Sequence, residues 1–162
     1  MGSSRTVTSA GLLVFRQCSG LLEVLLVHPG GPFFAKKDAG AWSIPKGEAN
    51  AGEDLFLRAQ IEFQEELGIE PPPGEAFELG SAKQKGNKTV HAWAIEGDLP
   101  SGFRLHSNSF QLEWPPRSGR IRSFPEIDRA EFFPLEVARE KMNPAQTVFL
   151  DCLGNHVAKG KF

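Results

Sequence analysis

The segment IEFQEELGIE, residues 61–70, places three carboxylates within five residues, those of Glu62, Glu65 and Glu66. Its composition favours a helix, in which positions three and four apart are neighbours on the surface. Like charges at that spacing destabilise a helix by about 0.2 to 0.5 kcal/mol per pair. A chain that keeps this segment must therefore offset the repulsion, either with solvent or with a cation.

The helix that contains this segment is predicted to span residues 54–67, because Gly68 and the proline run after it are typical of a helix end. At about 100° per residue, the three glutamates share one sector with Arg58. Both flanks of that sector are apolar, through Phe56, Ala59, Phe63 and Leu67 on one side and Leu57 and Ile61 on the other. We therefore expect a helix buried on both flanks whose carboxylates line a cleft suited to Mg²⁺. The alternative is a solvated acidic patch.

Length and composition limit the classes of protein to which the chain can belong. With 162 residues, 40% of them hydrophobic, it is expected to form a single domain over residues 1–162. Its net charge of −2 argues against a duplex nucleic-acid partner. No apolar run approaches the roughly 18 to 20 residues that cross a membrane, so no membrane partner is expected. Cys18 and Cys152 form no metal-binding pattern, which suits reduced thiols in a cytoplasmic protein.

Hydrophobic periodicity predicts the order of the elements. Four strands are predicted, at 9–15, 21–28, 89–98 and 130–133. Three helices are predicted, at 54–67, 135–142 and 145–153. Residues 106–123 have weak periodicity and are expected to form a long loop outside the sheet, a kind of segment that is often functional. This order favours a mixed sheet with helices on its faces.

A longer pattern surrounds the acidic helix. Its residues are, in order, Gly47, Glu53, Glu62, Phe63, Glu65, Glu66, Gly68 and Ile69. The spacing resembles the Nudix box, Gly-x5-Glu-x7-Arg-Glu-U-x-Glu-Glu-x-Gly-U, in which U is a bulky apolar residue. Eight of the nine specified positions agree over 23 residues. The preceding Trp42, Pro45 and Lys46 are similar to the segment that leads into the box in many members of that family.

The resemblance implies an α+β Nudix fold, an α/β/α sandwich around a mixed β-sheet. It also implies that water hydrolyses a nucleoside diphosphate linked to another group, with Mg²⁺ or Mn²⁺ as cofactor. By the same resemblance, the main metal ligands are the carboxylates of Glu62 and Glu66, with the Gly47 carbonyl. Glu65 is a further ligand or a water-mediated contact, and Glu53 is the remaining catalytic glutamate of the box. A metal suits this reaction because the negative charge of a diphosphate repels an attacking hydroxide.

The box departs from the family pattern at one position. Ile61 stands where the family has Arg, a residue that normally pairs with the catalytic glutamates and orients them. Arg58 lies in the acidic sector one turn earlier, four residues before Glu62, and we hypothesise that it supplies the missing cation. The alternative is an inactive relative that keeps the fold. We also count Arg58 among the candidate substrate-binding residues.

Two residues outside the helix are candidates for substrate binding. Lys46 precedes the box glycine and is expected to hold a phosphate as a point charge, unless it is an exposed loop lysine. Trp114, followed by Arg117, Arg120 and Arg122, is a candidate for stacking a base beside phosphate-binding arginines. The equal alternative is that Trp114 packs the loop down and the arginines are solvated.

The general base is not specified by the box. A carboxylate that faces the cleft from across the sheet is well placed to accept a proton from the attacking water. Glu126, at the entry to the predicted strand at 130–133, is our candidate because its position resembles a Glu-bearing loop of diadenosine polyphosphate hydrolases. Glu53 and Glu113 remain alternatives, and Glu126 itself is alternatively a solvent-exposed loop residue.

We therefore interpret the chain as a metal-dependent pyrophosphohydrolase that cleaves a phosphoanhydride bond of a small nucleotide. The segment before the box resembles that of hydrolases of dinucleoside polyphosphates and of diphosphoinositol polyphosphates. Dinucleoside polyphosphates are our first choice of substrate. Two other classes remain, a Nudix-fold nucleotide-binding module with little or no turnover, and a structural protein whose acidic helix binds calcium. A monomer and a homodimer are both compatible with the sequence.

Overall fold

A six-stranded mixed sheet forms the centre of the computed structural model, which describes residues 6–160. Five of its strands follow one another in the order β4 (Ala76–Gln84), β5 (Lys88–Glu96), β1 (Val7–Cys18), β2 (Leu21–Pro29) and β8 (Ile127–Pro134). β1 and β5 are parallel, whereas the other neighbours in this order are antiparallel. The sixth strand, β3 (Lys46–Glu48), pairs with the first part of β1, where Ala10 lies opposite Gly47.

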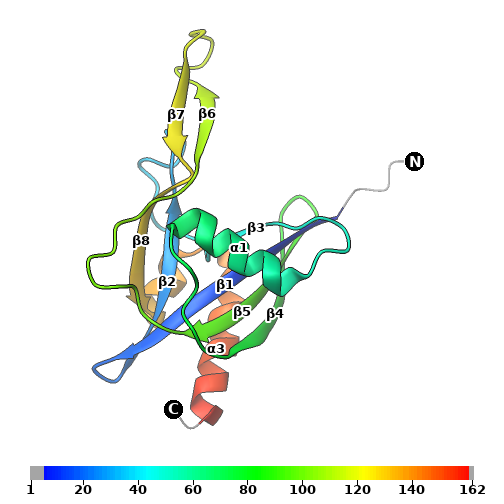
Figure 1. The fold of residues 1–162 in the computed structure, drawn as a ribbon, viewed down its shortest axis with the longest axis vertical. Coiled ribbons are helices and arrows are strands. Elements are labelled where there is room, and N and C mark those ends of the chain that lie inside the picture. Colours follow the sequence, from blue (N-terminus) through cyan, green and yellow to red (C-terminus); the bar gives the residue numbers. More distant parts are fainter. Residues whose placement is uncertain (1–5, 161–162) are drawn as a thin grey trace.

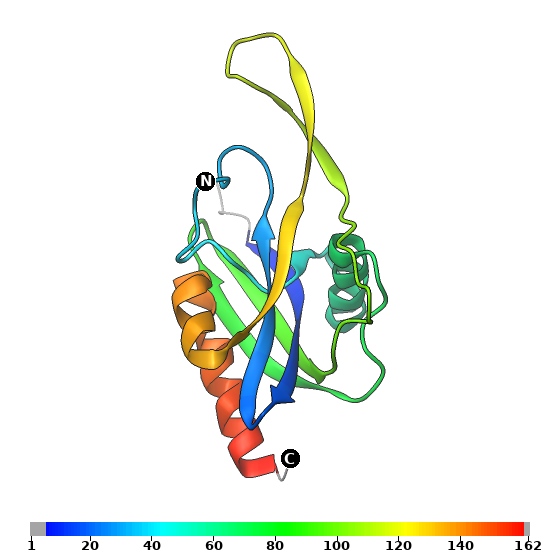
Figure 2. The same cartoon turned by 90° about the vertical axis from the view of Figure 1, so that its left-hand side faces the viewer.

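Helices cover both faces of the sheet, as Figure 2 shows. The helix α1 (Leu55–Leu67) lies on one face, and α2 (Leu135–Lys141) and α3 (Thr147–Gly160) lie on the other. The central strand β1 serves both layers because alternate side chains point to opposite faces. Leu12 and Val14 join the buried cluster under α1, whereas Leu13 and Phe15 join the cluster that contains Phe149 and Leu153 of α3. The predicted α/β/α sandwich and its α+β class are thus confirmed.

The ends of α1 follow from two residues. The side chain of Asp54 caps its start by accepting a hydrogen bond of 3.1 Å from the Leu57 N–H. Gly68 ends it in the left-handed region, with φ 78°, and its own N–H donates to the Gln64 carbonyl. The predicted helix at 54–67 therefore agrees with the observed one, apart from the capping residue.

The prediction that both flanks of α1 are buried is wrong. Ala59, Phe63 and Leu67 are buried against the sheet, as expected. On the other flank Leu57 is 52% exposed and Ile61 is only partly buried. The reason is that these two residues border an open groove between α1 and the proline-rich segment 71–73, and no layer of the fold covers it. The acidic sector therefore lies between one buried flank and one open flank.

The segment expected to be a long loop contains a hairpin of its own. The strands β6 (Ser109–Glu113) and β7 (Ile121–Pro125) form a separate two-stranded sheet, which projects from the body in Figure 1. The predicted strand at 130–133 is the second half of β8, and the last helix continues to residue 160. In the described part of the chain, no helix combines the length and the apolar character that crossing a membrane requires.

The asymmetry of the two flanks can be tested by truncation. We expect Phe63→Ala to lower the free energy of unfolding by about 3 to 5 kcal/mol, because it opens a cavity in a fully buried cluster. Leu57→Ala is expected to cost less than about 1 kcal/mol, because much of that side chain already contacts water. Urea unfolding of both variants measures the difference, and equal losses would mean that α1 is buried on both flanks.

Candidate active site

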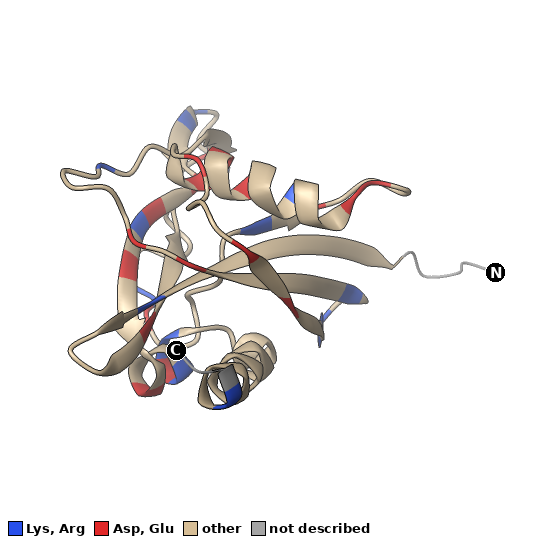
Figure 3. Cartoon of the chain, turned by 60° about the horizontal axis from the view of Figure 1, so that its bottom comes forward, with Lys and Arg blue, Asp and Glu red and all other residues tan. Residues whose placement is uncertain are grey.

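Three segments meet at the acidic face of α1. The helix contributes Glu62, Glu65 and Glu66, β3 contributes Lys46 and Gly47, and the link between β7 and β8 contributes Glu126. Figure 3 shows the acidic positions along α1 and the strands that pass beside them. The negative charge of Glu126 helps to raise the pKa of both Glu62 and Glu66, so this carboxylate is close enough to interact with both.

Gly47 is in direct contact with Glu62. A Cβ atom added at Gly47 would overlap all three atoms of the Glu62 carboxyl group. Only glycine therefore lets β3 approach the helix this closely, because any side chain would displace the carboxylate. The Gly47 backbone and the Glu62 carboxylate, both predicted as metal ligands, are held together by this contact.

Glu66 is the most unusual group of the site, since it is an acidic side chain that is only 7% exposed. Its Oε1 accepts a hydrogen bond of 3.3 Å from the Lys46 N–H. Its Oε2 is buried and has no hydrogen-bond partner among the described residues. Burial, with smaller contributions from the charges of Glu62 and Glu126, raises the pKa of Glu66 to about 8. Leaving such an oxygen unpaired is costly, which favours a site whose partner is a cation.

The other two helix carboxylates are more accessible. Burial raises the pKa of Glu62, and the neighbouring charges of Glu65 and Glu126 raise it further. Glu65 is exposed, and its backbone carbonyl accepts a hydrogen bond of 3.2 Å from the Asn108 N–H. The three glutamates thus range from exposed to buried. Only bound protons or a bound cation can reduce the negative charge of this helix face.

Arg58 bridges two of the box glutamates. Its Nη2 and Nε lie 2.6 and 2.9 Å from Glu53 Oε2, and its Nη1 lies 3.2 Å from Glu62 Oε1. The hydrogen bonds from Arg58 lower the pKa of Glu53, whose other oxygen accepts the Asn50 N–H at 2.9 Å. Arg58 was expected among the substrate-binding residues, but its guanidinium is engaged with these carboxylates. Its contacts are those of an orienting residue.

Lys46 lies beside Glu66 and is only partly exposed, rather than being a free loop lysine. Burial lowers the pKa of its ammonium group, against the opposing effect of the Glu66 and Glu48 charges. A lysine in this position presents a positive charge next to the carboxylates of Glu62, Glu65, Glu66 and Glu126, here called the acidic strip. A lysine beside these carboxylates suits an anion held next to a metal.

Backbone contacts hold Glu126 in place. Its N–H donates to the Asn108 carbonyl and its carbonyl accepts the Gly30 N–H, each at 2.8 Å. Gly30 has no room for a side chain, because an added Cβ would overlap the Pro125 carbonyl. Gly30 and Asn108 were not among the predicted site residues, although the Gly-Gly pair after β2 is a signal of close backbone approach.

Two candidates lie elsewhere. Trp114 is at the far end of β6, where its ring meets that of Phe33 edge to face at 5.4 Å. Glu113, an alternative base, is next to it and accepts hydrogen bonds from the N–H groups of Arg117 and Gly119. Both residues therefore belong to the hairpin rather than to the acidic strip.

The donors of the strip fit a hard divalent cation. They combine carboxylate oxygens with the Gly47 carbonyl, the oxygen ligands that Mg²⁺ and Mn²⁺ prefer. The unpartnered Oε2 of Glu66 supports this fit. Within residues 6–160, no three Asp, Glu, His or Cys side chains already form a ligand cluster. Mutual repulsion is a sufficient reason, because like-charged carboxylates converge only around a compensating charge.

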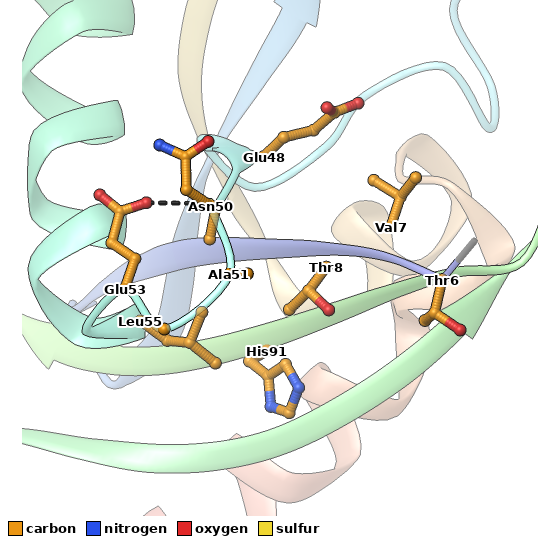
Figure 4. Close-up of a pocket in the computed structure, with 11 residues that line it drawn as sticks. Thr6, Val7, Thr8, Glu48, Asn50, Ala51, Glu53, Leu55 and His91 are labelled. Atoms are coloured by element: carbon orange, nitrogen blue, oxygen red, sulfur yellow. Dashed lines mark hydrogen bonds between the residues drawn. The ribbon is translucent and has the colours of Figure 1, made fainter.

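A cavity of about 590 Å³ borders the loop that precedes α1. Figure 4 shows this loop, with Glu48, Asn50 and Glu53, beside strands that carry Thr8 and His91. His91 is only partly buried and lines this cavity. Glu62, Glu66 and Glu126 are not among the lining residues, so the cavity lies beside the acidic strip and does not contain it.

Known proteins resemble the chain in sequence and in fold. Over 63 residues, 39% of the chain, it is 40% identical to Nudix hydrolase 7 of Arabidopsis thaliana, but it spans only 21% of that relative. Over 113 residues it is 27% identical to the asymmetrical bis(5'-nucleosyl)-tetraphosphatase of Caenorhabditis elegans, covering 67% of the chain and 78% of that protein. The crystal structure of a C. elegans Ap4A hydrolase binary complex aligns with a TM-score of 0.64 at 22% identity, covering 95% of this chain and 99% of that one.

The family model described as the NUDIX domain matches residues 5–152, which include the whole box and both segments that meet it, β3 and the entry to β8. The match extends over most of the chain, and the sandwich described above is the fold that the box implies. The chain therefore belongs to the NUDIX domain family.

Proposed function

We propose that the chain is a Mg²⁺- or Mn²⁺-dependent Nudix-type pyrophosphohydrolase that cleaves a phosphoanhydride bond of a dinucleoside polyphosphate by direct attack of water. The observation that carries the proposal is the buried, unpartnered Oε2 of Glu66, next to Glu62, Lys46 and Glu126. The family match supports the hydrolase class. The names of the two C. elegans proteins support the choice of a dinucleoside polyphosphate.

The residues of the site divide into three roles. The carboxylates of Glu62, Glu65 and Glu66, with the Gly47 carbonyl, would hold the cation. When bound, a divalent cation neutralises the phosphate oxygens and lowers the pKa of the attacking water. Lys46 opposes the negative charge on the leaving phosphate, and Arg58 fixes Glu53 and Glu62 in orientation.

Glu126 acts as the general base. As the water oxygen bonds to phosphorus, the Glu126 carboxylate takes the proton, and the bridging P–O bond breaks with its electron pair on the leaving phosphate. The backbone contacts to Gly30 and Asn108 support this role, because a base must be held in place. Glu53 is less suited, since both of its carboxylate oxygens already accept hydrogen bonds.

We further infer that residues 1–162 form one Nudix domain that works in the cytoplasm as a monomer or homodimer. One observation favours a different function, a nucleotide-binding module without turnover, because Ile61 replaces the family arginine. Hydrolysis that requires a divalent cation distinguishes the two functions.

The first test combines a substrate screen with one isosteric variant. We expect wild-type protein with Mg²⁺ to convert diadenosine tetraphosphate into identified nucleotide products, and EDTA to abolish the reaction. Glu66→Gln should lower turnover about 100-fold or more, because a metal ligand loses its charge. Glu70→Gln, at an exposed position just after α1, is the matched control. Turnover of the Glu66 variant near that of the control at saturating Mg²⁺ would contradict the assignment.

The stability of the same variant tests the burial of Glu66 without metal or substrate. Because the pKa of Glu66 is raised from 4.5 to about 8, its stabilising contribution is complete below pH 4.5 and is lost as the pH rises towards 8. In EDTA at pH 7, Glu66→Gln should therefore be more stable than wild type by about 1 to 3 kcal/mol. Urea unfolding at pH 5 and pH 7 measures this, with a larger difference expected at pH 7.

The orienting role of Arg58 is tested by removing and restoring the cation. We expect Arg58→Ala to weaken Mg²⁺ affinity and turnover together, each about 10- to 100-fold, because Glu53 and Glu62 lose their shared partner. Adding Ile61→Arg to this variant should recover part of both losses. Arg104→Ala, at an exposed position, is the control. Unchanged activity of Arg58→Ala would show that the carboxylates need no orienting cation.

The identity of the base is tested by pH–rate profiles. We expect Glu126→Gln to lower kcat by about 10²- to 10⁴-fold with little change in KM, and to remove the acidic limb of the profile. Glu53→Gln is the comparison, because Glu53 is the alternative base in the box. A profile that keeps its acidic limb in Glu126→Gln but loses it in Glu53→Gln would assign the base to Glu53.

A further inference from the structure

The hairpin of β6 and β7 is an ordered arm rather than a loose loop. Phe110 pairs with Phe124 across the two strands, with ring centroids 5.9 Å apart. The Glu113 carboxylate fixes the turn by accepting the N–H groups of Arg117 and Gly119, at 3.3 and 3.0 Å. The Trp114 N–H donates to the Arg120 carbonyl at 2.9 Å. The turn thus has its own hydrogen bonds, and the arm keeps its shape without a covering layer.

A second segment braces one side of the arm. The loop after β2 follows the arm. Its Gly30 lies against the Pro125 carbonyl, and its Gly31 lies against the Phe110 ring. Further along, Phe33 contacts Trp114. This loop is itself fixed further along, because the buried His28 ring donates from Nε2 to the Lys37 carbonyl at 2.7 Å. The contact between Phe33 and Trp114 is therefore held from two directions.

The arm is positively charged in a chain whose net charge is −2. Arg117, Arg120 and Arg122 are all exposed, and none forms an ion pair within the described residues. The single acidic residue of the hairpin, Glu113, is occupied by backbone N–H groups. Aromatic surface is exposed next to these charges, since Phe33 is 58% exposed. Arginines beside an aromatic pair suit an anion that carries a ring.

The arm is continuous with the acidic strip. β7 ends at Pro125, and the next residue is Glu126. At about 3.3 Å per residue, Arg122 lies roughly 13 Å from Glu126 along the strand, and Arg120, opposite Trp114, lies roughly 20 Å away. A dinucleoside polyphosphate, whose second nucleoside is joined through further phosphates, spans a distance of this order.

We propose that the arm and Phe33 form the subsite for the distal nucleotide of a dinucleoside polyphosphate. This inference rests on the proposed function and identifies the residues that recognise the second nucleotide of that substrate. Trp114 and Phe33 stack the distal base, and Arg117, Arg120 and Arg122 neutralise the phosphates between the two nucleosides. The turn carries Pro115, Pro116 and Gly119. Ile121 just after it is 63% exposed, but it lies between Arg120 and Arg122 in the sequence rather than in an apolar face, so nucleotide binding fits the arm better than insertion into a lipid surface.

Binding to metal-free protein tests the arm separately from catalysis. In EDTA, calorimetry measures the Kd of diadenosine tetraphosphate and of ADP for wild type and for a variant with Arg117→Glu, Arg120→Glu and Arg122→Glu. A matched control carries Lys83→Glu, Lys85→Glu and Lys159→Glu, three exposed positions on β4, in the turn after β4 and on α3, with the same change in net charge. We expect the arm variant to weaken the binding of diadenosine tetraphosphate about tenfold or more, and that of ADP several-fold less. The control should lose far less affinity for the dinucleotide.

A second pair of variants tests stacking without changing charge. Trp114→Ala should raise the Kd for diadenosine tetraphosphate, whereas Trp114→Phe should keep most of the affinity, because a ring remains. Equal losses in the arm variant and the lysine control would overturn the proposal, as would an equal loss for ADP. Unchanged dinucleotide affinity, with lost binding to a single-stranded oligoribonucleotide or to anionic vesicles, would also overturn it.

Turnover of the wild type with Mg²⁺ separates this proposal from the proposed function. Hydrolysis of diadenosine tetraphosphate together with unchanged affinity in the arm variant would overturn the role of the arm and leave the function standing. Arm-dependent binding without any hydrolysis by the wild type would overturn the function and support the arm as a nucleotide subsite.

Discussion

The contact between Gly47 and the Glu62 carboxylate is the constraint on which the rest of the site depends. It joins α1 to β3, and β3 joins the first half of β1, the central strand of the sheet. The acidic residues share one face of α1 because they are three and four positions apart, and the contact with Gly47 places Glu62 beside β3. Burial and neighbouring negative charge raise the pKa of both Glu62 and Glu66.

The fold pays for this concentration of charge through other contacts. The apolar flank of α1, with Phe63 and Leu67, forms one buried cluster with Leu12 and Val14 of β1. Buried apolar surface of this kind stabilises a domain enough to tolerate a few unfavourable polar groups. Electrostatic strain at a site therefore coexists with a well-packed interior, a combination common where a protein binds a charged ligand.

Sequence alone predicted the features that depend on local pattern. The ends of α1 followed from the predicted helix at 54–67, and the order of strands and helices predicted a sheet covered on both faces. Four strands were missed for physical reasons: β3, β4, and the hairpin strands β6 and β7, which lie in a segment of weak periodicity. β3 is three residues long and too short to show periodicity, and β4 is interrupted where the pairing shifts between Glu78 and Gly80. The exposure of Leu57 was also missed, because a helical wheel says where a flank points but not what covers it.

The site was predictable only where it depends on local sequence pattern. The spacing of the box identified the glutamates of α1, whereas the convergence of Glu126 with them depends on how β8 enters the sheet, which no local pattern reports. The separation of Trp114 from the acidic strip depends likewise on the hairpin. Arg58 illustrates the opposite case. The family motif assigns the cation to position 61, but the helix brings Arg58 to the same carboxylates. The motif therefore excludes a residue that can make the same contacts. A search for relatives that lack the usual arginine should therefore ask whether any cation can reach the glutamates, one turn away in either direction.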